Sequence, residues 1–501
     1  MANAMKQLAG ETAIYGMSTI LARIINFLFV PFYTRLLTTA NYGVVTEFMA
    51  YIAVLQVVLV LGLETGCFHF ANKEGVESRK VYSNALATVF GISTAFLACM
   101  LVFAKPIASM LGYAGYESCI MYMGGILALD SVTAILFAKL RQEHKALKFA
   151  IFKTVKILTE TGANILFFFW FPGFVASHPD TFLLNFVSAT PDFSYVMFSI
   201  LLSCIVCGFL FVPDLLKFSF EFDGKLLKKM LVYSLPLMVA SLPGIVNDFL
   251  DRILFRFFDT NSQVWQSSLG VFQAAVKLSV IMNLFIQMFR YAAEPFFFQR
   301  AKDKDSKQQY AQVMEWFTAF CGLIFLGVIL YIDVISLILG RDFREGVGVV
   351  PIMLFSYMLL GMLFNVSMWY KLSGKTSMAI YITLAGLIVT LVINIIFMPM
   401  YSYWASAYGH LASYLVMFVI SAVLGAKYYP IPYRWTKIIG SIAVMAAVYL
   451  ISLGVDKLWF TGFDLTSSGV WTIMAKFTLH TALIIVYAGA CWLLLRSRKV
   501  K

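Results

Sequence analysis

Long apolar runs separated by short polar segments dominate the chain. A helix needs about 20 apolar residues to cross a bilayer core of about 30 Å. The runs are continuous rather than alternating, which favours helices over barrel strands. The pattern predicts about fourteen transmembrane helices, near residues 10–31, 44–64, 84–104, 118–138, 149–171, 193–213, 230–254, 268–290, 312–332, 349–370, 377–398, 404–425, 436–454 and 471–494.

A weak internal repeat relates the two halves. Tyr15-Gly16 opens the first span and Tyr233-Ser234 opens the seventh, while Thr34-Arg35 and Asp251-Arg252 lie at their ends. Six spans per repeat give both halves the same orientation, with a cavity expected between them.

We therefore expect an all-α membrane protein with two six-helix lobes and two extra C-terminal helices. The N-terminal lobe covers 1–213 and the C-terminal lobe 230–425, and 426–501 holds the last two helices with a basic tail. Segment 214–229 is basic and amphipathic, so we expect it to link the lobes along the cytoplasmic membrane surface.

Composition and charge strengthen this interpretation. Hydrophobic residues make up 61% of the 501 residues and charged residues 13%, against about 25% charged in soluble proteins. Cytoplasmic loops carry an excess of Lys and Arg. A cytoplasmic N-terminus puts most of the 38 Lys and Arg on that side. The opposite loops hold only Arg35, Lys105, Arg256, Arg341, Arg344 and Lys457. We expect a multi-pass membrane protein with both termini cytoplasmic.

Motifs for enzymatic chemistry are missing from the sequence. Residues 373–377 read Ser-Gly-Lys-Thr-Ser, but a phosphate-binding loop needs a glycine where this chain has Trp369. The seven cysteines and five histidines show neither a disulfide framework nor metal-ligand spacing. The sequence therefore predicts no enzyme, no cofactor, no metal, and no nucleotide or nucleic acid as partner.

Charged residues inside spans are the informative ones, because each costs about 2.5–3.5 kcal/mol in hydrocarbon. In the fifth span, Lys153, Lys156, Glu160 and Asn164 follow one another at intervals of 3, 4 and 4, which puts them on one helical face. The stripe predicts a wet cavity from the cytoplasmic end to mid-membrane. The alternative is that both lysines extend to the inner head groups.

Basic residues outnumber acidic ones at depth, which predicts a cationic lumen for an anionic head group such as a diphosphate. The candidate substrate-binding residues are Arg23, Lys153, Lys156, Asn164, Lys277 and Arg290. The candidates for coupling to H⁺ or Na⁺ are Asp130, Glu160, Asp248 and Asp251. For each basic residue alone, a structural ion pair or a head-group contact is the alternative.

The seventh span contains Pro236, Pro243 and Gly244, and proline removes a helical hydrogen bond and favours a bend. The segment predicts a hinge that alternates access to the two sides. A static kink is the other interpretation.

Several short motifs resemble the polysaccharide transporter family, which includes Wzx-type O-antigen and capsule-unit flippases. They are Tyr15-Gly16, Arg23 to Asn26, Pro31 to Leu37, Asn41-Tyr42-Gly43, Leu140-Arg141 to Ala146, Tyr233 to Leu237, Asp251-Arg252, and Pro399 to Tyr408. The resemblance covers essentially the whole chain and places it in the multidrug/oligosaccharidyl-lipid/polysaccharide exporter superfamily.

The resemblance implies a two-lobed fold shared with multidrug extruders and the lipid II flippase. It implies that the chain moves an undecaprenyl-diphosphate-linked oligosaccharide from the inner to the outer leaflet of the bacterial cytoplasmic (inner) membrane by alternating access, for O-antigen or capsule synthesis. Arg23 falls where lipid II flippases carry a first-helix arginine proposed to meet the diphosphate. We expect a monomer, and association with the polymerase and glycosyltransferases of the pathway stays open.

Two other functions compete with this one. A cation-coupled antiporter for small molecules calls for a lumen dominated by acids, against the basic excess found here. A membrane glycosyltransferase or ligase usually has a large outer loop with catalytic residues, and this chain has no long loop.

Overall fold

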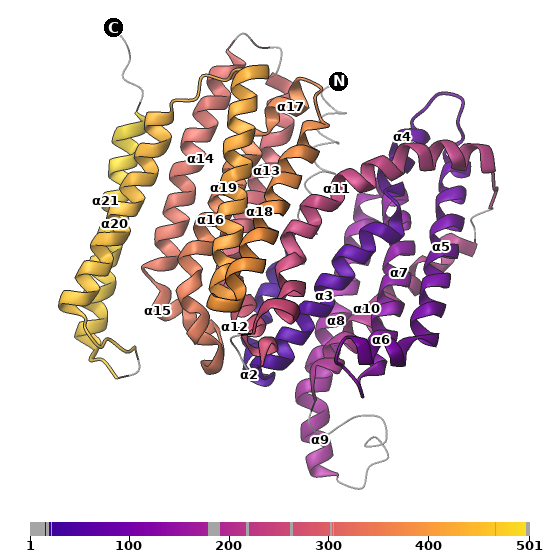
Figure 1. Ribbon diagram of the computed structural model, residues 1–501, viewed down its shortest axis with the longest axis horizontal. Helices are drawn as coiled ribbons and strands as arrows, with labels where there is room; N and C mark the ends of the chain where they lie inside the picture. Colours follow the sequence, from indigo (N-terminus) through magenta and orange to yellow (C-terminus); the bar gives the residue numbers. More distant parts are fainter. Residues whose placement is uncertain are drawn as a thin grey trace. The chain divides into compact units, whose positions relative to one another are not determined.

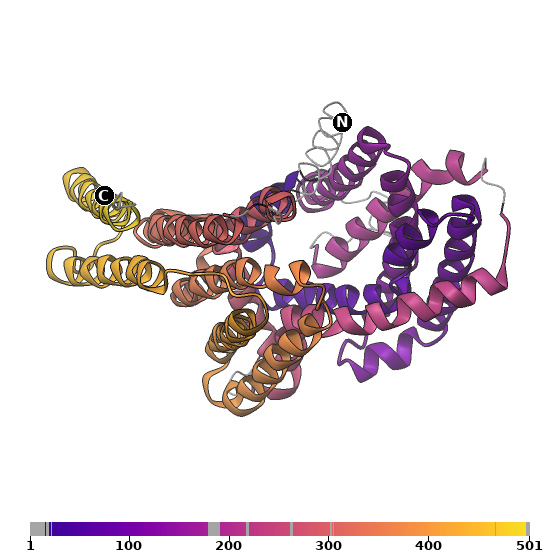
Figure 2. The same cartoon turned by 90° about the horizontal axis from the view of Figure 1, so that it is seen from above.

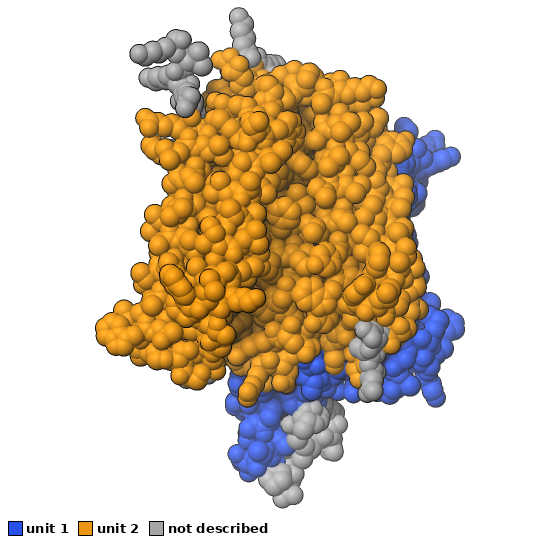
Figure 3. Space-filling view, turned by 60° about the vertical axis from the view of Figure 1, so that its left-hand side comes forward, with its two compact units in different colours: residues 1–28, 36–253 blue, residues 29–35, 254–501 orange. Residues whose placement is uncertain are grey.

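The computed structural model describes residues 16, 20–21, 23–178, 191–216, 220–260, 264–300, 303, 305–465 and 467–496. These residues form helices and contain no strand (Figure 1). The chain divides into two compact units, one of residues 1–28 and 36–253, the other of 29–35 and 254–501 (Figure 3). The division falls inside helix α11 (Gly224–Phe258). The predicted lobe boundaries remain a prediction.

The first unit contains the helices from α3 to α10 and the first thirty residues of α11. In chain order they are α3 (Thr39–Val60), α4 (Leu63–Ala71), α5 (Ser78–Val102), α6 (Ala104–Met110), α7 (Glu117–Gln142), α8 (Ala146–Ile165), η1 (Leu166–Trp170), α9 (Phe171–Ser177) and α10 (Phe193–Leu216). α3 begins at a good capping residue, because the Thr38 hydroxyl accepts a hydrogen bond of 3.2 Å from the amide of Asn41.

The second unit contains α2 (Val30–Leu36) together with the remaining helices. These are α12 (Trp265–Leu278), α13 (Val280–Arg300), α14 (Ser306–Ile329), α15 (Ile332–Ile335), η3 (Ser336–Ile338), η4 (Arg341–Val349), α16 (Val350–Val366), α17 (Met368–Leu372), α18 (Met378–Tyr401), α19 (Tyr403–Tyr428), α20 (Trp435–Trp459) and α21 (Val470–Leu495). Arg35 holds α2 to this unit, since its guanidinium donates to the carbonyl of Leu337 at 3.0 Å. α20 and α21 form a pair beside α14 (Figures 1 and 2).

Eleven helices among the described residues are long and apolar enough to span a membrane, or twelve if α12 and α13, bent by 51°, make one span. The predicted all-α membrane fold is confirmed, and the expected number of fourteen is not established. Ten of the 22 residues of the predicted span 10–31 lie outside the described residues. Residues 149–171 are helical, as predicted, and are divided among α8, η1 and α9. The polar stripe lies in the first of these helices, α8.

The second span is broken, which the apolar pattern did not reveal. Leu61 and Gly62 have positive φ angles of 55° and 67°, so α3 ends at Val60 and α4 begins at Leu63, within one candidate span of 33 residues. A Cβ on Gly62 would lie 2.6 Å from the carbonyl oxygen of Ser234 in α11. Only glycine allows both this backbone conformation and this close approach of the two helices.

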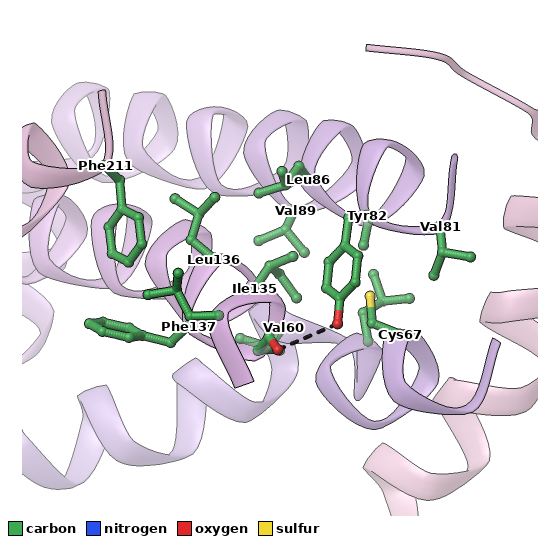
Figure 4. Close-up of a cluster of buried hydrophobic side chains, with 14 of the residues drawn as sticks. Val60, Cys67, Val81, Tyr82, Leu86, Val89, Ile135, Leu136, Phe137 and Phe211 are labelled. Atoms are coloured by element: carbon green, nitrogen blue, oxygen red, sulfur yellow. Dashed lines mark hydrogen bonds between the residues drawn. The ribbon is translucent and has the colours of Figure 1, made fainter. Parts of the chain in front are cut away.

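A cluster of apolar side chains from α4, α5, α7 and α10 forms the core of the first unit (Figure 4). Tyr82 is buried there, and its hydroxyl donates to the carbonyl of Ala138 at 3.4 Å. The edge-to-face pair of Phe137 and Phe211, 5.0 Å between centroids, joins α7 to α10.

The predicted linker is partly helical and is attached to α5. α10 continues to Leu216, and α11 starts at Gly224. Between them, the Asp223 amide donates to the Asn84 side chain at 2.9 Å, and Asn84 donates back to the Asp223 carbonyl at 3.1 Å. This exchange fixes the start of α11 against the first turns of α5. A position on the membrane surface remains a prediction.

Candidate substrate-binding and ion-coupling residues

The polar stripe of α8 lies in the first unit, where α8 packs against α7 and α10. Asn164, at the far end of the stripe, is fully buried, and its amide donates to the backbone carbonyl of Glu160 at 2.8 Å. The side-chain oxygen of Asn164 has no hydrogen-bond partner within the described part of the chain. The stripe therefore ends inside the bundle with one acceptor available to a water molecule or a ligand.

Lys156 forms an ion pair with Asp130 of α7. The ammonium lies 2.5 Å from the carboxylate, and the two side chains are 17% and 25% exposed. The thiol of Cys204, on α10, borders the same pair. The two residues had been assigned separately, Lys156 to substrate and Asp130 to ion coupling, and the structure brings them together. Glu160 follows Lys156 by four residues in α8, on the same helical face.

Lys153 is compensated in another way. Its ammonium lies 4.3 Å from the ring centroid of Phe137, and the side chain is half-buried. A cation over a ring face is stabilised by the ring's quadrupole. The five residues Asp130, Lys153, Lys156, Glu160 and Asn164 thus form one polar cluster, which we call the α8 cluster.

The other predicted residues of the first unit lie on its two flanking segments. Arg23 and Asp248 are exposed, whereas Asp251 is fully buried. The Arg252 guanidinium lies 4.6 Å from the ring of Phe249.

The helix α11 continues without interruption through the predicted hinge residues Pro236, Pro243 and Gly244. The helix bends along its length (Figure 1), as expected for two internal prolines. Movement at this bend, which the hinge interpretation requires, remains a prediction.

Two predicted residues lie in the second unit. Lys277 is half-buried in the last turn of α12, next to the bend into α13. Arg290 is exposed on α13, with its guanidinium 4.7 Å from the ring of Phe364. The same ring lies 5.4 Å from the ammonium of Lys371, which also pairs with Glu294 at 2.5 Å. Phe364 thus joins a predicted site residue to an ion pair that the sequence did not indicate.

A second charged network, absent from the predicted site, connects α21 to α15 and α20. The ammonium of Lys476, 5% exposed, lies 2.7 Å from the Asp333 carboxylate and 3.5 Å from that of Asp456. The His480 ring lies 3.1 Å from the Asp456 carboxylate and 2.6 Å from the carbonyl oxygen of Leu330. Lys476 and His480 are four residues apart in α21, which puts them on one helical face. Their acidic partners lie in distant segments without a recognisable motif.

Comparison with solved structures finds proteins of similar fold. The chain is similar to the lipid II flippase MurJ in an inward closed conformation, with a TM-score of 0.68, 13% identity, and 95% and 98% of the two chains covered. It is also similar to a multidrug resistance MATE family transporter of the MOP superfamily in an inward-facing conformation, with a TM-score of 0.59, 13% identity, and 81% and 94% covered. At these identities the likeness shows the fold alone.

Sequence comparison identifies the family. Residues 8–301, more than half of the chain, match the family described as Polysaccharide biosynthesis protein, and the chain belongs to this family. None of the curated proteins compared with the chain matches it. The predicted resemblance and the predicted MATE-like fold are confirmed. The protein is a multi-span helical membrane protein of this family, and its fold is similar to the folds of a lipid II flippase and a MATE transporter.

Proposed function

We propose that the protein is a flippase for an undecaprenyl-diphosphate-linked oligosaccharide, which it moves from the inner to the outer leaflet of the cytoplasmic membrane by alternating access. The proposal rests on two findings about the same chain. Its sequence matches a polysaccharide biosynthesis family, and its fold is similar to that of a lipid II flippase over 95% of its length. A lipid-linked sugar as substrate would agree both with the polysaccharide biosynthesis named for the family and with the lipid named for the flippase.

The lysines of the α8 cluster support an anionic substrate. Lys156 and Lys153 are basic groups inside a helical bundle, where the diphosphate of a lipid-linked sugar would be recognised by charge-assisted hydrogen bonds. In the proposed role, the diphosphate competes with Asp130 for Lys156 when it enters. Arg23, Asn164, Lys277 and Arg290 complete the proposed set of substrate-binding residues.

The test is transport by purified protein in vesicles. A fluorescent undecaprenyl-diphosphate oligosaccharide is added, and the fraction exposed outside is followed with an impermeant quencher. The wild type is expected to equilibrate the lipid between leaflets at least ten times faster than empty vesicles. Lys156→Met is expected to lose most of this activity, and Lys375→Met, a loop control 3.7 Å from the Tyr428 ring, is expected to keep it.

A cation-coupled antiporter of small molecules is the second candidate. The fold similarity to a multidrug MATE transporter favours it, and Asp130, Glu160, Asp248 and Asp251 would be its coupling acids. The same vesicles distinguish the two. Export of a cationic dye driven by a proton or sodium gradient, without movement of the lipid-linked sugar, would overturn the flippase proposal.

A further inference from the structure

An apolar groove runs between α5, α7 and α10 of the first unit, with a volume of about 860 Å³. Its floor includes the buried Leu86 and Leu136 of the core cluster (Figure 4). Phe90 and Phe209 stand at its rim and are 61% and 69% exposed. The lining on α10 extends from Leu201 to Leu215, which at 1.5 Å per residue is a length of about 21 Å.

A polar pocket of about 220 Å³ adjoins one end of the groove, and the two share Leu136 and Leu215 in their walls. The pocket is lined by two bases and two acids, namely Lys139, Lys145, Glu143 and Asp214. Lys145 pairs with Glu143 at 2.7 Å, and this hydrogen bond raises the pKa of Lys145. The pocket therefore presents both signs of charge at the end of a long apolar surface.

The pairing of groove and pocket matches the shape of an amphiphile. An apolar surface of this length is stabilised by covering it with a hydrocarbon chain, and its volume is within the usual range of ligand sites. A ligand that consisted of a hydrocarbon chain alone would have no polar group to contact the charged side chains of the adjoining pocket. Glu143 already pairs with Lys145 and, at 3.7 Å, with Lys139, and Asp214 pairs with Lys148 at 2.6 Å. A head group with a phosphate alone would draw lysines away from these carboxylates and leave them without a cation. A head group that carries one phosphate and one ammonium matches both signs.

We propose that this groove binds a zwitterionic membrane phospholipid, with an acyl chain along α5, α7 and α10 and the head group between the lysines and acids of the adjoining pocket. The phosphate faces Lys139 and Lys145, and the ammonium faces Glu143 and Asp214. Ser93, whose buried hydroxyl has no hydrogen-bond partner among the described residues, lies in the groove wall and accommodates the polar ester region or a water molecule. The site is separate from the α8 cluster and does not depend on the proposed function.

Two glycines provide a matched pair of variants. Gly208 lines the groove, and a Cβ there meets only Leu129, at 3.8 Å. Gly91 of α5 has nothing within 4 Å of its Cβ position and is not part of the groove lining. Gly208→Phe therefore fills the groove, while Gly91→Phe adds the same ring elsewhere on the first unit. Thr94→Phe, at an exposed lining position on α5, is a second groove-filling variant if Gly208→Phe fails to fold.

The experiment is lipid binding by native mass spectrometry of the delipidated full-length protein. Phosphatidylethanolamine, phosphatidylglycerol with the same acyl chains, and undecaprenyl phosphate are titrated separately. We expect one phosphatidylethanolamine to bind at least tenfold more tightly than phosphatidylglycerol. We also expect a groove-filling variant to lose at least tenfold in this affinity while Gly91→Phe keeps it.

Three outcomes would overturn the proposal. They are equal binding of the two phospholipids, equal binding by Gly208→Phe, Thr94→Phe and Gly91→Phe, and tighter groove-dependent binding of undecaprenyl phosphate, which would assign the groove to a polyprenyl chain. None of them bears on transport of the lipid-linked sugar, so this proposal can fail while the proposed function stands.

Discussion

Lys153 and Lys156 are three residues apart on α8, yet the protein compensates their charges by different means. Lys156 has a carboxylate at 2.5 Å, whereas Lys153 has an aromatic ring at 4.3 Å. The contrast matters because removing one member of a buried ion pair leaves a charge behind, and removing a cation from a ring does not. Neighbouring residues of the same type therefore make different contributions to stability.

We expect Lys156→Met to destabilise the protein by about 3–5 kcal/mol, because Asp130 would keep its charge in a largely buried place. Lys153→Met should cost about 0.5–2 kcal/mol, the range of a cation over a ring. The measurement is denaturant unfolding of the purified variants in detergent. Asp130→Asn combined with Lys156→Met should recover most of the loss. Equal losses for the two single variants would contradict the assignment of the ion pair.

Gly62 offers a second test at the scale of one residue. Gly62→Ala should lose about 1–2 kcal/mol from its left-handed backbone, and more because its Cβ would lie 2.6 Å from the Ser234 carbonyl. Gly75→Ala is the control, since Gly75 has a φ of 77° and nothing within 4 Å. A thermal unfolding series that ranks Gly75→Ala as the more harmful change would show that α4 and α11 do not need this close contact.

At the scale of elements, the helices could be predicted from sequence far better than their interruptions. Each long apolar run produced a helix wherever the structure describes it, because a backbone in lipid must satisfy its own hydrogen bonds. The break at Leu61 and Gly62 has no such signal, since both residues continue an apolar run. Similarly, the face shared by Lys153, Lys156, Glu160 and Asn164 follows from helical periodicity, but the choice of Asp130 as partner depends on how α7 packs against α8.

The charged network around Lys476 connects α21 to α15 and α20, and we expect its removal to destabilise α21. Lys476→Met leaves the carboxylates of Asp333 and Asp456 without their shared cation. We expect amide hydrogen exchange in α20 and α21 to become at least tenfold faster, with α3 and α7 unchanged. Lys457→Met, at the exposed end of α20, should leave exchange at its wild-type rate. Unchanged exchange in Lys476→Met would show that apolar packing alone holds the pair of helices.

At the scale of the whole molecule, sequence alone predicts the orientation of the protein in the membrane. The distribution of Lys and Arg puts both termini in the cytoplasm. The loop between α4 and α5 should therefore be cytoplasmic and the loop between α20 and α21 external. In a cysteine-free background, we expect an impermeant maleimide to label Thr461→Cys on intact cells and Glu74→Cys only after permeabilisation. The reverse pattern would invert the topology.

Three ion pairs of the protein also have an order in time. Asp130 precedes Lys156 in the chain, Glu294 precedes Lys371, and Asp333 precedes Lys476. Because synthesis proceeds from the N-terminus, the ribosome makes each carboxylate first and its ammonium 26, 77 or 143 residues later. Each of these lysines is therefore made after its partner carboxylate has been made. A nascent chain that stalls between the two residues contains the carboxylate but not the lysine that neutralises it.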